Sequence, residues 1–313
     1  MKLSPVYVGV DVSMDTIDVY DPSTLQSSVV SMIGSDLKRF ADQMVQQGSI
    51  VVFEATGGYD HPLAMALSEV GAAYVRVNPG RARSFARSFS SGAKTDKVDA
   101  RMLSKMGQAL ELSADAPMNQ KRQELSALVT RRNQLVDARK RERTQIRQAS
   151  NASIKASHDK MIDLLSDEIA AFDRAIAELI AQSPEASRLD KRLQTVPGFG
   201  PVCAATLIAS LPELGHVDRR AIASLTGLAP IARDSGQRKG ARSIAGGRRD
   251  VRRILYLAAQ QAVKLIPHMT ALRNRLTATG RTPKQALIAV ARRIIVIANA
   301  MIRDAKDFEY AST

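Results

Sequence analysis

The chain has 313 residues, a hydrophobic content of 45% and a net charge of +14 at pH 7. This length allows two compact domains, and this composition excludes a wholly disordered chain. The positive charge favours polyanionic partners, and a single cysteine, Cys203, excludes disulfides and thiolate metal clusters.

The sequence argues against four other features. The four histidines show no paired ligand spacing, so we expect no structural zinc site. Aromatic residues make up 4% of the chain, which argues against a base-stacking surface for single strands. We expect no signal peptide, because the first apolar stretch is a strand that leads to a charge and is too short for a signal sequence. We expect no membrane-spanning helix, because Arg292 and Arg293 interrupt the best candidate, residues 286–301. The sequence therefore predicts a soluble protein of a reducing compartment.

The first third of the chain predicts a mixed β-sheet. Apolar or alternating runs indicate strands at 6–12, 16–20, 27–32, 50–54 and 73–77. Helical spacing indicates helices at 37–45, 62–70, 81–89 and 96–110. Three consecutive strands followed by alternating helices and strands predict a sheet with helices on both faces. This is the strand order of the ribonuclease H-like fold.

Four carboxylates, called the acidic set below, lie at the ends of these elements: Asp11, Glu54, Asp96 and Asp99. Asp11 ends a buried strand, where its charge is costly unless something pairs with it. Carboxylates without histidine or cysteine suit hard cations such as Mg²⁺. Two such ions about 4 Å apart can hold the attacking and leaving oxygens of a phosphodiester. The acidic set therefore predicts a metal site that acts on phosphate.

Each member of the acidic set also has a structural interpretation. Asp11 and Glu54 could be solvated residues at strand ends. With Thr95 as N-cap, Asp96 and Asp99 would lie in the first helical turn and complement the helix dipole without a metal. Taken singly, this interpretation is favoured for the two helix residues. The positions of all four acids in a ribonuclease H-like fold favour the metal site.

The middle of the chain, from about residue 120 to 182, contains no glycine or proline. Apolar residues at helical spacing predict two long antiparallel helices, broken near residue 150 or 157. We interpret this part as a coiled-coil spacer or dimer stalk. Its basic cluster could touch nucleic acid, although a solvated helix face is the commoner explanation. That cluster comprises Arg139, Lys140, Arg141, Arg143 and Arg147.

After Pro184 the chain is again mostly helical. The turn Pro197-Gly198-Phe199-Gly200 separates two helices and predicts a helix-hairpin-helix. Gly198 and Gly200 would let backbone N–H groups approach a phosphate at a helix N-terminus. Glycine turns between helices are common, so this motif alone is of moderate specificity.

Ser235 lies between Asp234 and Gly236, which is the composition of a common turn. From spacing alone it is a loop residue. However, basic residues around a serine could bind phosphates and favour attack of its hydroxyl on one of them. The candidates for nucleic-acid contact near it are Arg238, Lys239, Arg242, Arg248 and Arg249.

Six segments in this order carry a family resemblance: Gly9–Asp11, Glu54–Gly57, Lys94–Arg101, Pro197–Gly200, Gly227–Pro230 and Ser235–Gly236. They resemble the DEDD transposases of insertion sequences that use a bridge RNA, the family that also contains the Piv DNA invertase. The resemblance covers nearly the whole chain, and the K-T-D-x-x-D-A block is its most specific part. It implies an α/β RuvC-like domain (1–112), a helical coiled-coil spacer (113–186) and a mostly helical transposase domain (187–313).

The resemblance also implies the chemistry of the site. The acidic set would bind Mg²⁺ or Mn²⁺, and Ser235 would be the nucleophile that forms a covalent link to DNA. Dimers and tetramers would combine the acids of one subunit with the serine of another. Donor and target duplex DNA would pair with a structured guide RNA, in the bacterial cytoplasm at the nucleoid. Residues 244–249 depart from members that carry a serine-lysine-glycine run, which indicates a sister subgroup.

The sequence leaves four functions to compare. The leading hypothesis is an RNA-guided, site-specific DNA recombinase of an insertion sequence. A metal-dependent Holliday-junction-type nuclease would cut with water and need no serine. A non-catalytic nucleic-acid-binding scaffold would need neither the acids nor the serine. A kinase of the actin-like fold is disfavoured, because the second glycine-rich phosphate turn is missing and the positive charge would have no role.

Overall fold

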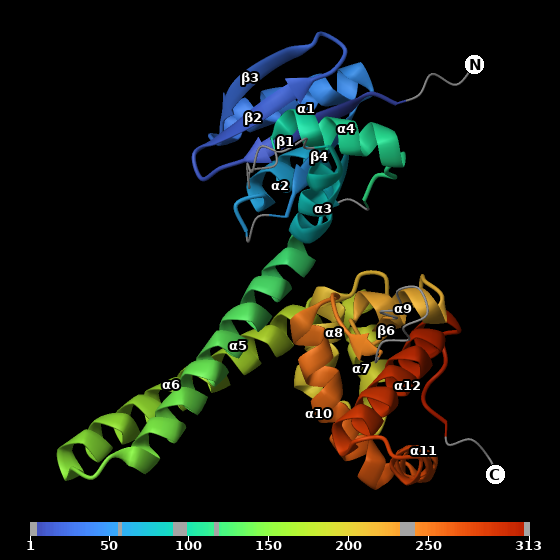
Figure 1. The fold of residues 1–313 in the computed structure, drawn as a ribbon. Helices are drawn as coiled ribbons and strands as arrows, with labels where there is room; N and C mark the ends of the chain where they lie inside the picture. Colours follow the sequence, from blue (N-terminus) through green and yellow to red (C-terminus); the bar gives the residue numbers. More distant parts are fainter. Residues whose placement is uncertain (1–4, 56–57, 90–98, 116–118, 232–241, 310–313) are drawn as a thin grey trace. The chain divides into compact units, whose positions relative to one another are not determined.

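The computed structural model describes residues 5–55, 58–89, 99–115, 119–231 and 242–309. The chain divides into two compact units, Met1–Gln120 and Lys121–Thr313. Figure 1 shows strands and short helices in the first unit and helices through most of the second. The domain boundaries predicted at residues 112 and 186 stay a prediction.

The first unit is built on a five-stranded mixed sheet with the order β3-β2-β1-β4-β5. Its strands are β1 (Tyr7–Val12), β2 (Thr16–Asp21), β3 (Gln26–Ser31), β4 (Ile50–Glu54) and β5 (Ala73–Val77). The first three strands pair antiparallel, while β1 with β4 and β4 with β5 pair parallel. The ribonuclease H-like strand order predicted from the sequence is therefore confirmed.

Helices cover both faces of this sheet: α1 (Gly34–Gln47) and α2 (His61–Glu69) on one face, α3 (Pro79–Phe89) and α4 (Ala100–Leu110) on the other. Alternation along β1 decides which side chain meets which helices. Val8 and Val10 join the core with α1 and α2, whereas Tyr7 joins the core with α4. Asp11, four residues after Tyr7, therefore lies on the α4 face.

Close packing on β1 fixes the position of α4. A Cβ atom at Gly9 would lie 1.8 Å from the carbonyl oxygen of Ala100 and 2.6 Å from the nitrogen of Ser104. A Cβ atom at Gly107 would lie 2.7 Å from the ring of Tyr7. The Ser104 hydroxyl also donates a hydrogen bond to the carbonyl oxygen of Tyr7 at 2.6 Å. Only glycine at these two positions lets the helix backbone approach the strand this closely.

Asp99 is the N-cap of α4 rather than a residue of its first turn. Its backbone is extended, with φ −83° and ψ 165°, and its carboxylate accepts a hydrogen bond from the nitrogen of Met102 at 2.7 Å. The prediction that Thr95 caps this helix is therefore wrong, because the Asp99 side chain itself satisfies an N–H group of the first turn. Thr95 and Asp96 lie outside the described residues.

The second unit is helical apart from one short ribbon among its described residues. Its helices are α5 (Gln120–Gln145), α6 (Ala152–Ala181), α7 (Pro184–Gln194), α8 (Pro201–Ser210), α9 (Arg219–Leu225), α10 (Arg249–Leu265), α11 (Pro267–Ala278) and α12 (Pro283–Arg303), with a 3₁₀ turn at Ile146–Gln148. The helices α7, α8, α9, α10, α11 and α12 share one hydrophobic core, to which Leu125 of α5 and Ile180 of α6 also belong.

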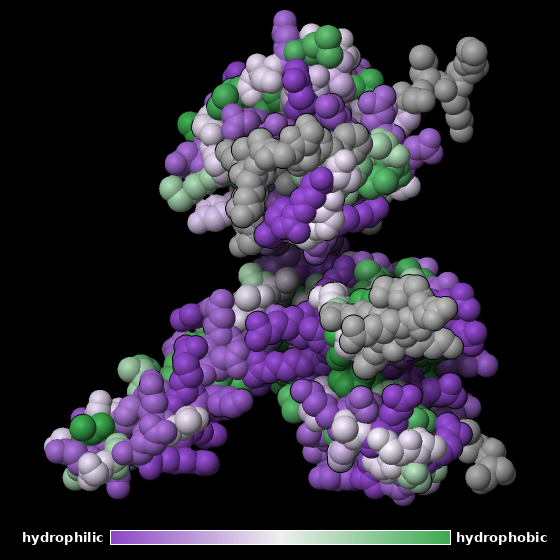
Figure 2. All heavy atoms as spheres, in the orientation of Figure 1, coloured by the Kyte–Doolittle hydropathy of each residue, from purple (hydrophilic) through white to green (hydrophobic). Residues whose placement is uncertain are grey.

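The long helices α5 and α6 run antiparallel, as predicted. Two contacts between facing side chains set their register: the ion pair of Arg132 with Asp173 at 2.8 Å, and the hydrogen bond between Glu142 and the Nδ1 of His158 at 2.6 Å. The helices are separated at Asn151, whose side chain caps α6, so the predicted break near residue 150 is confirmed. Their visible surface is mainly hydrophilic in Figure 2.

The C-terminal helix α12 is long and apolar enough to cross a membrane by length and composition alone. Its apolar side chains, among them Val290, Ile294 and Ile295, are buried in the core of the second unit. A buried core helix passes the same test. The burial of this apolar face accounts for its composition.

Candidate active site

Asp11 and Asp99 line the same cleft of the first unit, which has a volume of about 520 Å³. Asp11 is half-buried at the end of β1, and Asp99 is exposed at the start of α4. The close packing of α4 on β1 brings the two carboxylates to this cleft. The rest of the wall comes mainly from β2, β3 and the first turn of α4.

Glu54 reaches the neighbourhood of Asp11 from the adjacent strand. The parallel register pairs Val10 with Phe53, so Asp11 and Glu54 follow at the same level of the sheet. Burial raises the pKa of Glu54, and the charge of Asp11 raises it further, while Arg83 on α3 acts in the opposite direction. The sequence prediction that Asp11 and Glu54 lie together is consistent with this geometry.

One oxygen of Glu54, Oε1, is buried and has no hydrogen-bond partner among the described residues. A buried carboxylate oxygen next to a second carboxylate is costly unless a cation or a proton compensates it. This donor set contains only oxygen, which is what Mg²⁺ and similar cations prefer. The residues therefore fit a divalent metal chemically.

A complete metal site does not follow from the described part of the chain. Within residues 5–55, 58–89, 99–115, 119–231 and 242–309, no group of three or more acidic, histidine or cysteine side chains is close enough to hold an ion. Asp96, the remaining member of the acidic set, lies outside these residues. The assignment of the acidic set as metal ligands stays a prediction.

Asp18 is a carboxylate of this cleft that the sequence prediction missed. The hairpin register pairs it with Asp11, so both side chains lie on the same face of the sheet. The alternation of residues 16–20, combined with a hairpin to β1, is the signal that could have identified it. On the same wall, Arg101 of α4 stacks over the ring of Tyr20 at 5.0 Å.

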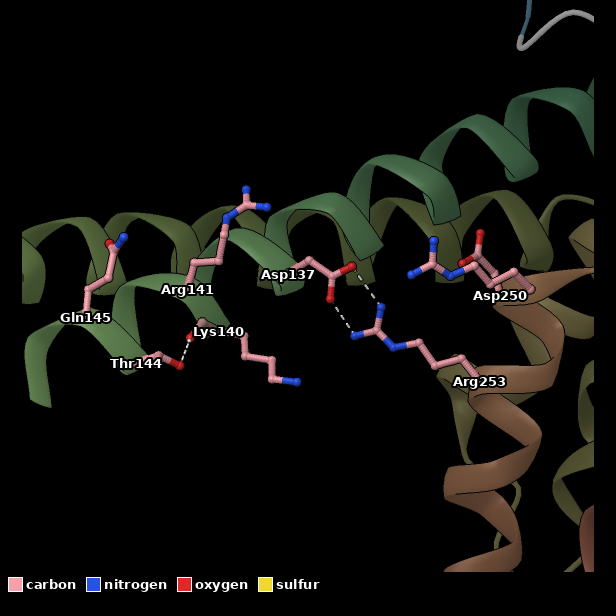
Figure 3. Close-up of a pocket in the computed structure, with 8 residues that line it drawn as sticks. Asp137, Lys140, Arg141, Thr144, Gln145, Asp250 and Arg253 are labelled. Carbon is pink, nitrogen blue, oxygen red and sulfur yellow. Dashed lines mark hydrogen bonds and ion pairs between the residues drawn. The ribbon is translucent and has the colours of Figure 1, made fainter. Parts of the chain in front are cut away.

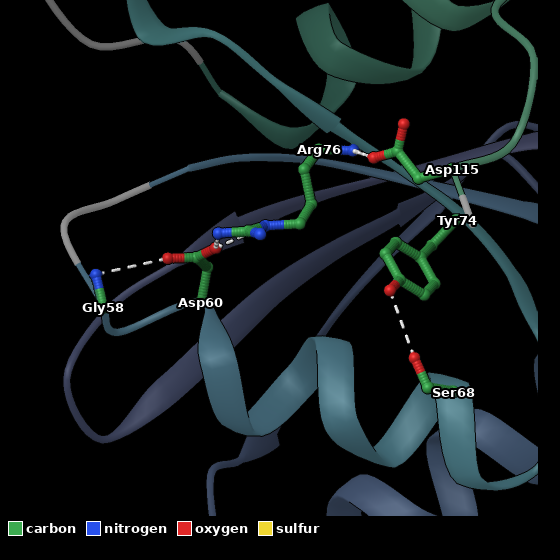
Figure 4. A network of polar contacts seen from close by, with 6 residues as sticks. All are labelled: Gly58, Asp60, Ser68, Tyr74, Arg76 and Asp115. Atoms are coloured by element: carbon green, nitrogen blue, oxygen red, sulfur yellow. Dashed lines mark hydrogen bonds and ion pairs between the residues drawn. The ribbon is translucent and has the colours of Figure 1, made fainter. Parts of the chain in front are cut away.

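The chain that follows Glu54 is held by a buried ion pair (Figure 4). The carboxylate of Asp60 is fully buried and accepts hydrogen bonds from Arg76 Nε at 2.8 Å and from the nitrogen of Gly58 at 3.3 Å. Arg76 lies on β5, and its backbone N–H donates to Asp115 at 2.7 Å. Asp60 and Arg76 therefore connect the start of α2 to β5 beside the end of β4.

In the second unit, the predicted turn between two helices is present, as α7, the turn and α8. Gly198 has a positive φ of 99°, and a Cβ atom there would lie 2.8 Å from the carbonyl oxygen of Ala258 on α10. Gly198 therefore permits close packing of the turn on α10. Gly200 is the exposed N-cap residue of α8, and its Cβ position faces open space. Contact of either glycine with nucleic acid stays a prediction.

The predicted nucleophile Ser235 and its neighbours Arg238 and Lys239 lie outside the described residues. The chain on both sides is ordered by a ribbon in which β6 (Pro230–Ile231) pairs antiparallel with β7 (Ser243–Ile244). The sequence interpretation missed this ribbon, because each strand is only two residues long. Arg242, which precedes β7, is exposed.

Two of the predicted basic residues differ in their surroundings. Arg248 donates to both oxygens of Glu213, at 2.7 Å each. Burial opposes the charge of Glu213, but the hydrogen bonds and charge of Arg248 outweigh it and hold the pKa of Glu213 below its usual value. The structure thus gives Arg248 a partner that the sequence did not predict. Arg249 is exposed at the start of α10.

Two protein-family models match the chain. One, described as a transposase of the DEDD type named after IS110, matches residues 8–151. The other, described as the transposase of the IS116/IS110/IS902 family, matches residues 190–274. The first match includes β4, α4 and all of β1 except Tyr7, and the second includes β6 and β7.

Several curated proteins are similar to this chain. The pilin gene-inverting proteins of Moraxella lacunata and Moraxella bovis are each 27% identical over 319 residues, which covers 98% of this chain and 98% of theirs. An uncharacterized protein of insertion element IS116 from Streptomyces clavuligerus is 33% identical over 155 residues, 48% of this chain and 39% of its own. The similarity therefore extends along the whole chain in one group and along about half of it in the other.

Proposed function

This chain belongs to the IS110/IS116 family of DEDD transposases, enzymes that catalyse DNA transfer, and from this premise we propose that it is an RNA-guided, site-specific recombinase of an insertion sequence. The observation that carries the proposal is the buried oxygen of Glu54 beside Asp11, which has no hydrogen-bond partner in the described part of the chain. Such an oxygen on the sheet of a ribonuclease H-like fold suits a cation that acts on a phosphodiester.

The acidic set would hold the divalent metal, Mg²⁺ or Mn²⁺, which would supply charge neutralisation at the scissile phosphate. Ser235 would attack the phosphorus atom with its hydroxyl oxygen. The new serine–phosphate bond forms as the bond to the leaving deoxyribose oxygen breaks, and the serine proton is lost while the leaving oxygen gains one. Because one ester replaces another, the reverse attack by a new DNA end can rejoin the strands.

The resemblance to bridge-RNA transposases supports the proposed partners. These are donor and target duplex DNA, a structured guide RNA and further copies of this chain, with the acids of one subunit serving Ser235 of another. The first 112 residues would form a RuvC-like domain, residues 113–186 a coiled-coil spacer, and residues 187–313 a transposase domain with a helix-hairpin-helix. The proposed location is the bacterial cytoplasm at the nucleoid.

DNA inversion is a second candidate outcome of the same chemistry. It is favoured by one observation: the two pilin gene-inverting relatives match this chain over 98% of both lengths, whereas the IS116 protein matches 48% of it. Inversion and transposition would share the nucleophile and the acidic set. They would differ in how the two DNA sites are oriented.

The proposal is tested by trapping the covalent intermediate. The full chain, purified from its host with any bound RNA, is incubated with its cognate element DNA and Mg²⁺. We expect a protein–DNA adduct that resists denaturation and that is lost in Ser235→Ala and in Asp11→Asn. Ser243→Ala, an exposed serine of β7, is the matched control and should retain the adduct.

Cleavage that survives Ser235→Ala would contradict the serine mechanism and favour the water-using nuclease. Binding without cleavage by the wild-type protein would favour a non-catalytic scaffold.

A further inference from the structure

A second cleft lies within the second unit and contains no member of the acidic set among its lining residues. It has a volume of about 720 Å³ and lies between α5 and the first turns of α10 (Figure 3). The α5 side contributes Asp137, Lys140, Arg141, Thr144 and Gln145, and the α10 side contributes Arg249, Asp250 and Arg253. We call it the α5–α10 cleft. Most of its lining residues belong to no site predicted from the sequence.

One ion pair fixes the two walls of the cleft relative to each other. Arg253 Nη1 and Nη2 donate to the two carboxylate oxygens of Asp137 at 2.8 and 2.6 Å. The hydrogen bond from Arg253 lowers the pKa of Asp137, so this carboxylate stays charged at neutral pH. A two-point pair of this kind sets orientation as well as distance. The cleft is therefore shaped by a contact within the protein itself.

The remaining charges of the lining are mainly positive. With Arg253 engaged by Asp137, the cleft still presents the cations of Lys140, Arg141 and Arg249 against the single carboxylate of Asp250. All three cationic residues are exposed. Figure 3 shows Lys140 extending from α5 toward the α10 wall. Gln145 adds an uncharged hydrogen-bond donor, whereas the Thr144 hydroxyl donates to the carbonyl oxygen of Lys140 at 2.9 Å.

This combination of side chains selects a class of ligand. Lysine, arginine, threonine and glutamine are the residues that contact phosphate oxygens in nucleic-acid complexes. Among the described residues, the lining contains no aromatic side chain on which a base could stack, so single-stranded bases would gain little there. An open cationic cleft without stacking surfaces fits the sugar-phosphate backbone of a duplex.

We propose that the α5–α10 cleft binds the phosphate backbone of a nucleic-acid duplex, through Lys140, Arg141 and Arg249. The proposal rests on the proposed function, because it requires nucleic acid as the partner. It adds a sequence-independent holding site made of residues other than the acidic set and Ser235. Both DNA duplexes and base-paired RNA stems present this backbone, and the experiment distinguishes them.

The test compares two triple variants of the full chain. The cleft variant carries Lys140→Gln, Arg141→Gln and Arg249→Gln. The control variant carries Lys155→Gln, Arg174→Gln and Arg188→Gln, which remove the same charge from exposed positions on α6 and α7 outside the cleft. Fluorescence anisotropy measures the affinity for a 30-base-pair DNA duplex (roughly three helical turns), for an RNA hairpin stem and for an unpaired DNA strand, at several salt concentrations.

We expect the cleft variant to lose at least about tenfold in affinity for a duplex at ~0.15 M salt, and its logarithmic salt slope to fall by about 2 to 3. The control should stay within about threefold of the wild type, because distant exposed charges are screened. A larger loss with DNA or with the RNA stem identifies the occupant, and equal losses assign the cleft to both. Equal losses in the two variants, or a loss confined to the unpaired strand, would overturn the proposal.

The serine adduct assay separates this inference from the proposed function. If the wild type forms the Ser235 adduct but the cleft and control variants bind duplexes equally, only the cleft proposal fails. If the wild type forms no adduct although the cleft variant alone loses duplex binding, the cleft proposal holds and the recombinase mechanism fails. Thermal unfolding of both triple variants checks that these exposed substitutions leave the fold intact.

Discussion

At the scale of single residues, one oxygen of Glu54 lies in surroundings that are unfavourable for a charged carboxylate. Glu54 Oε1 is buried without a hydrogen-bond partner among the described residues, and the charge of Asp11 lies nearby. Both features disfavour the ionised carboxylate in the isolated protein. Residues that bind charged ligands commonly lower the stability of the folded protein in this way.

Glu54→Gln should therefore stabilise the protein when no divalent cation is added. An amide removes the buried charge and its repulsion by Asp11, which we expect to raise stability by up to about 1 kcal/mol. Added Mg²⁺ should raise the Tm of the wild type and leave that of the variant unchanged. Differential scanning calorimetry with and without Mg²⁺ measures both effects. A variant that is less stable than the wild type without metal would show that Glu54 has a structural partner.

Asp60 represents the opposite case, a buried charge that is fully paired. Its side chain is 1% exposed and Arg76 contacts it at 2.7 Å. Asp60→Ala would leave the guanidinium half-buried without its partner, so we expect a loss of about 2–4 kcal/mol. Asp36→Ala is the control, because Asp36 pairs with a largely exposed Arg39 at 3.3 Å and should cost less than about 1 kcal/mol.

The hydrogen exchange of the backbone amides of β5, measured at increasing urea concentrations, distinguishes the Asp60 and Asp36 variants. Similar exchange in both would show that the Asp60–Arg76 pair contributes little to holding the end of β4.

At the level of elements, the position of α4 depends on Gly9, because any side chain there would collide with the backbone of α4. Gly9→Ala would place a Cβ atom 1.8 Å from the carbonyl oxygen of Ala100, and backbone cannot yield as a flexible side chain can. We expect α4 to shift, with a stability loss of about 2–4 kcal/mol and loss of strand cleavage, because Asp99 moves with the helix.

Gly34→Ala is the matched control for Gly9→Ala. A Cβ atom there would meet nothing within 4 Å, so the Tm and cleavage should be retained. Wild-type cleavage in Gly9→Ala would show that the spacing of α4 from β1 does not matter for the reaction.

The pair of Glu213 and Arg248 links the turn after α8 to the N-cap of α10 and should make stability depend on pH. The pKa of Glu213 is held below its ordinary 4.5 in the folded chain. The pair therefore stabilises the fold above pH 4.5, and its contribution is lost as the pH falls through the lower folded pKa. Glu213→Gln should cost about 1 kcal/mol at pH 7 and should flatten the loss of stability below pH 5.

Thermal unfolding of Glu213→Gln and wild type between pH 3 and 7 measures this pH dependence. Glu178→Gln, which removes an exposed carboxylate of α6, is the charge control. Parallel stability curves for the wild type and Glu213→Gln would contradict the assignment.

At the scale of the whole molecule, the order of strands and helices could be predicted, because the spacing of apolar residues and the length of each apolar run specify it. The apolar run of β1 and the alternation of β2 are local signals, and they led to the observed sheet order. The close approach of Gly9 to Ala100 could not be predicted, because it depends on a helix some 90 residues away in the chain. The N-cap at Asp99 was missed because Thr95 offers an equally suitable side chain by propensity alone.

In the candidate site too, residues marked by a local pattern could be predicted, whereas those that depend on tertiary contacts could not. Asp11 and Glu54 were identified because a strand that ends on an acid is a local pattern. Asp18 required knowledge of the hairpin register, and the pairing of Arg248 with Glu213 required knowledge of tertiary contacts across 35 residues. The pattern of basic residues identified charge but not which charges are already neutralised by a partner.

The segment after α4 has one more consequence. Asp115 donates its N–H to the carbonyl oxygen of Tyr74 and accepts the N–H of Arg76, so it occupies the outer rim of β5. In the five-stranded sheet, β3 is the other edge strand, and no strand among the described residues pairs with its outer edge. Self-association through strand addition, including aggregation during overexpression, should therefore begin at β3, where the polar Gln26, Ser27 and Ser28 discourage it.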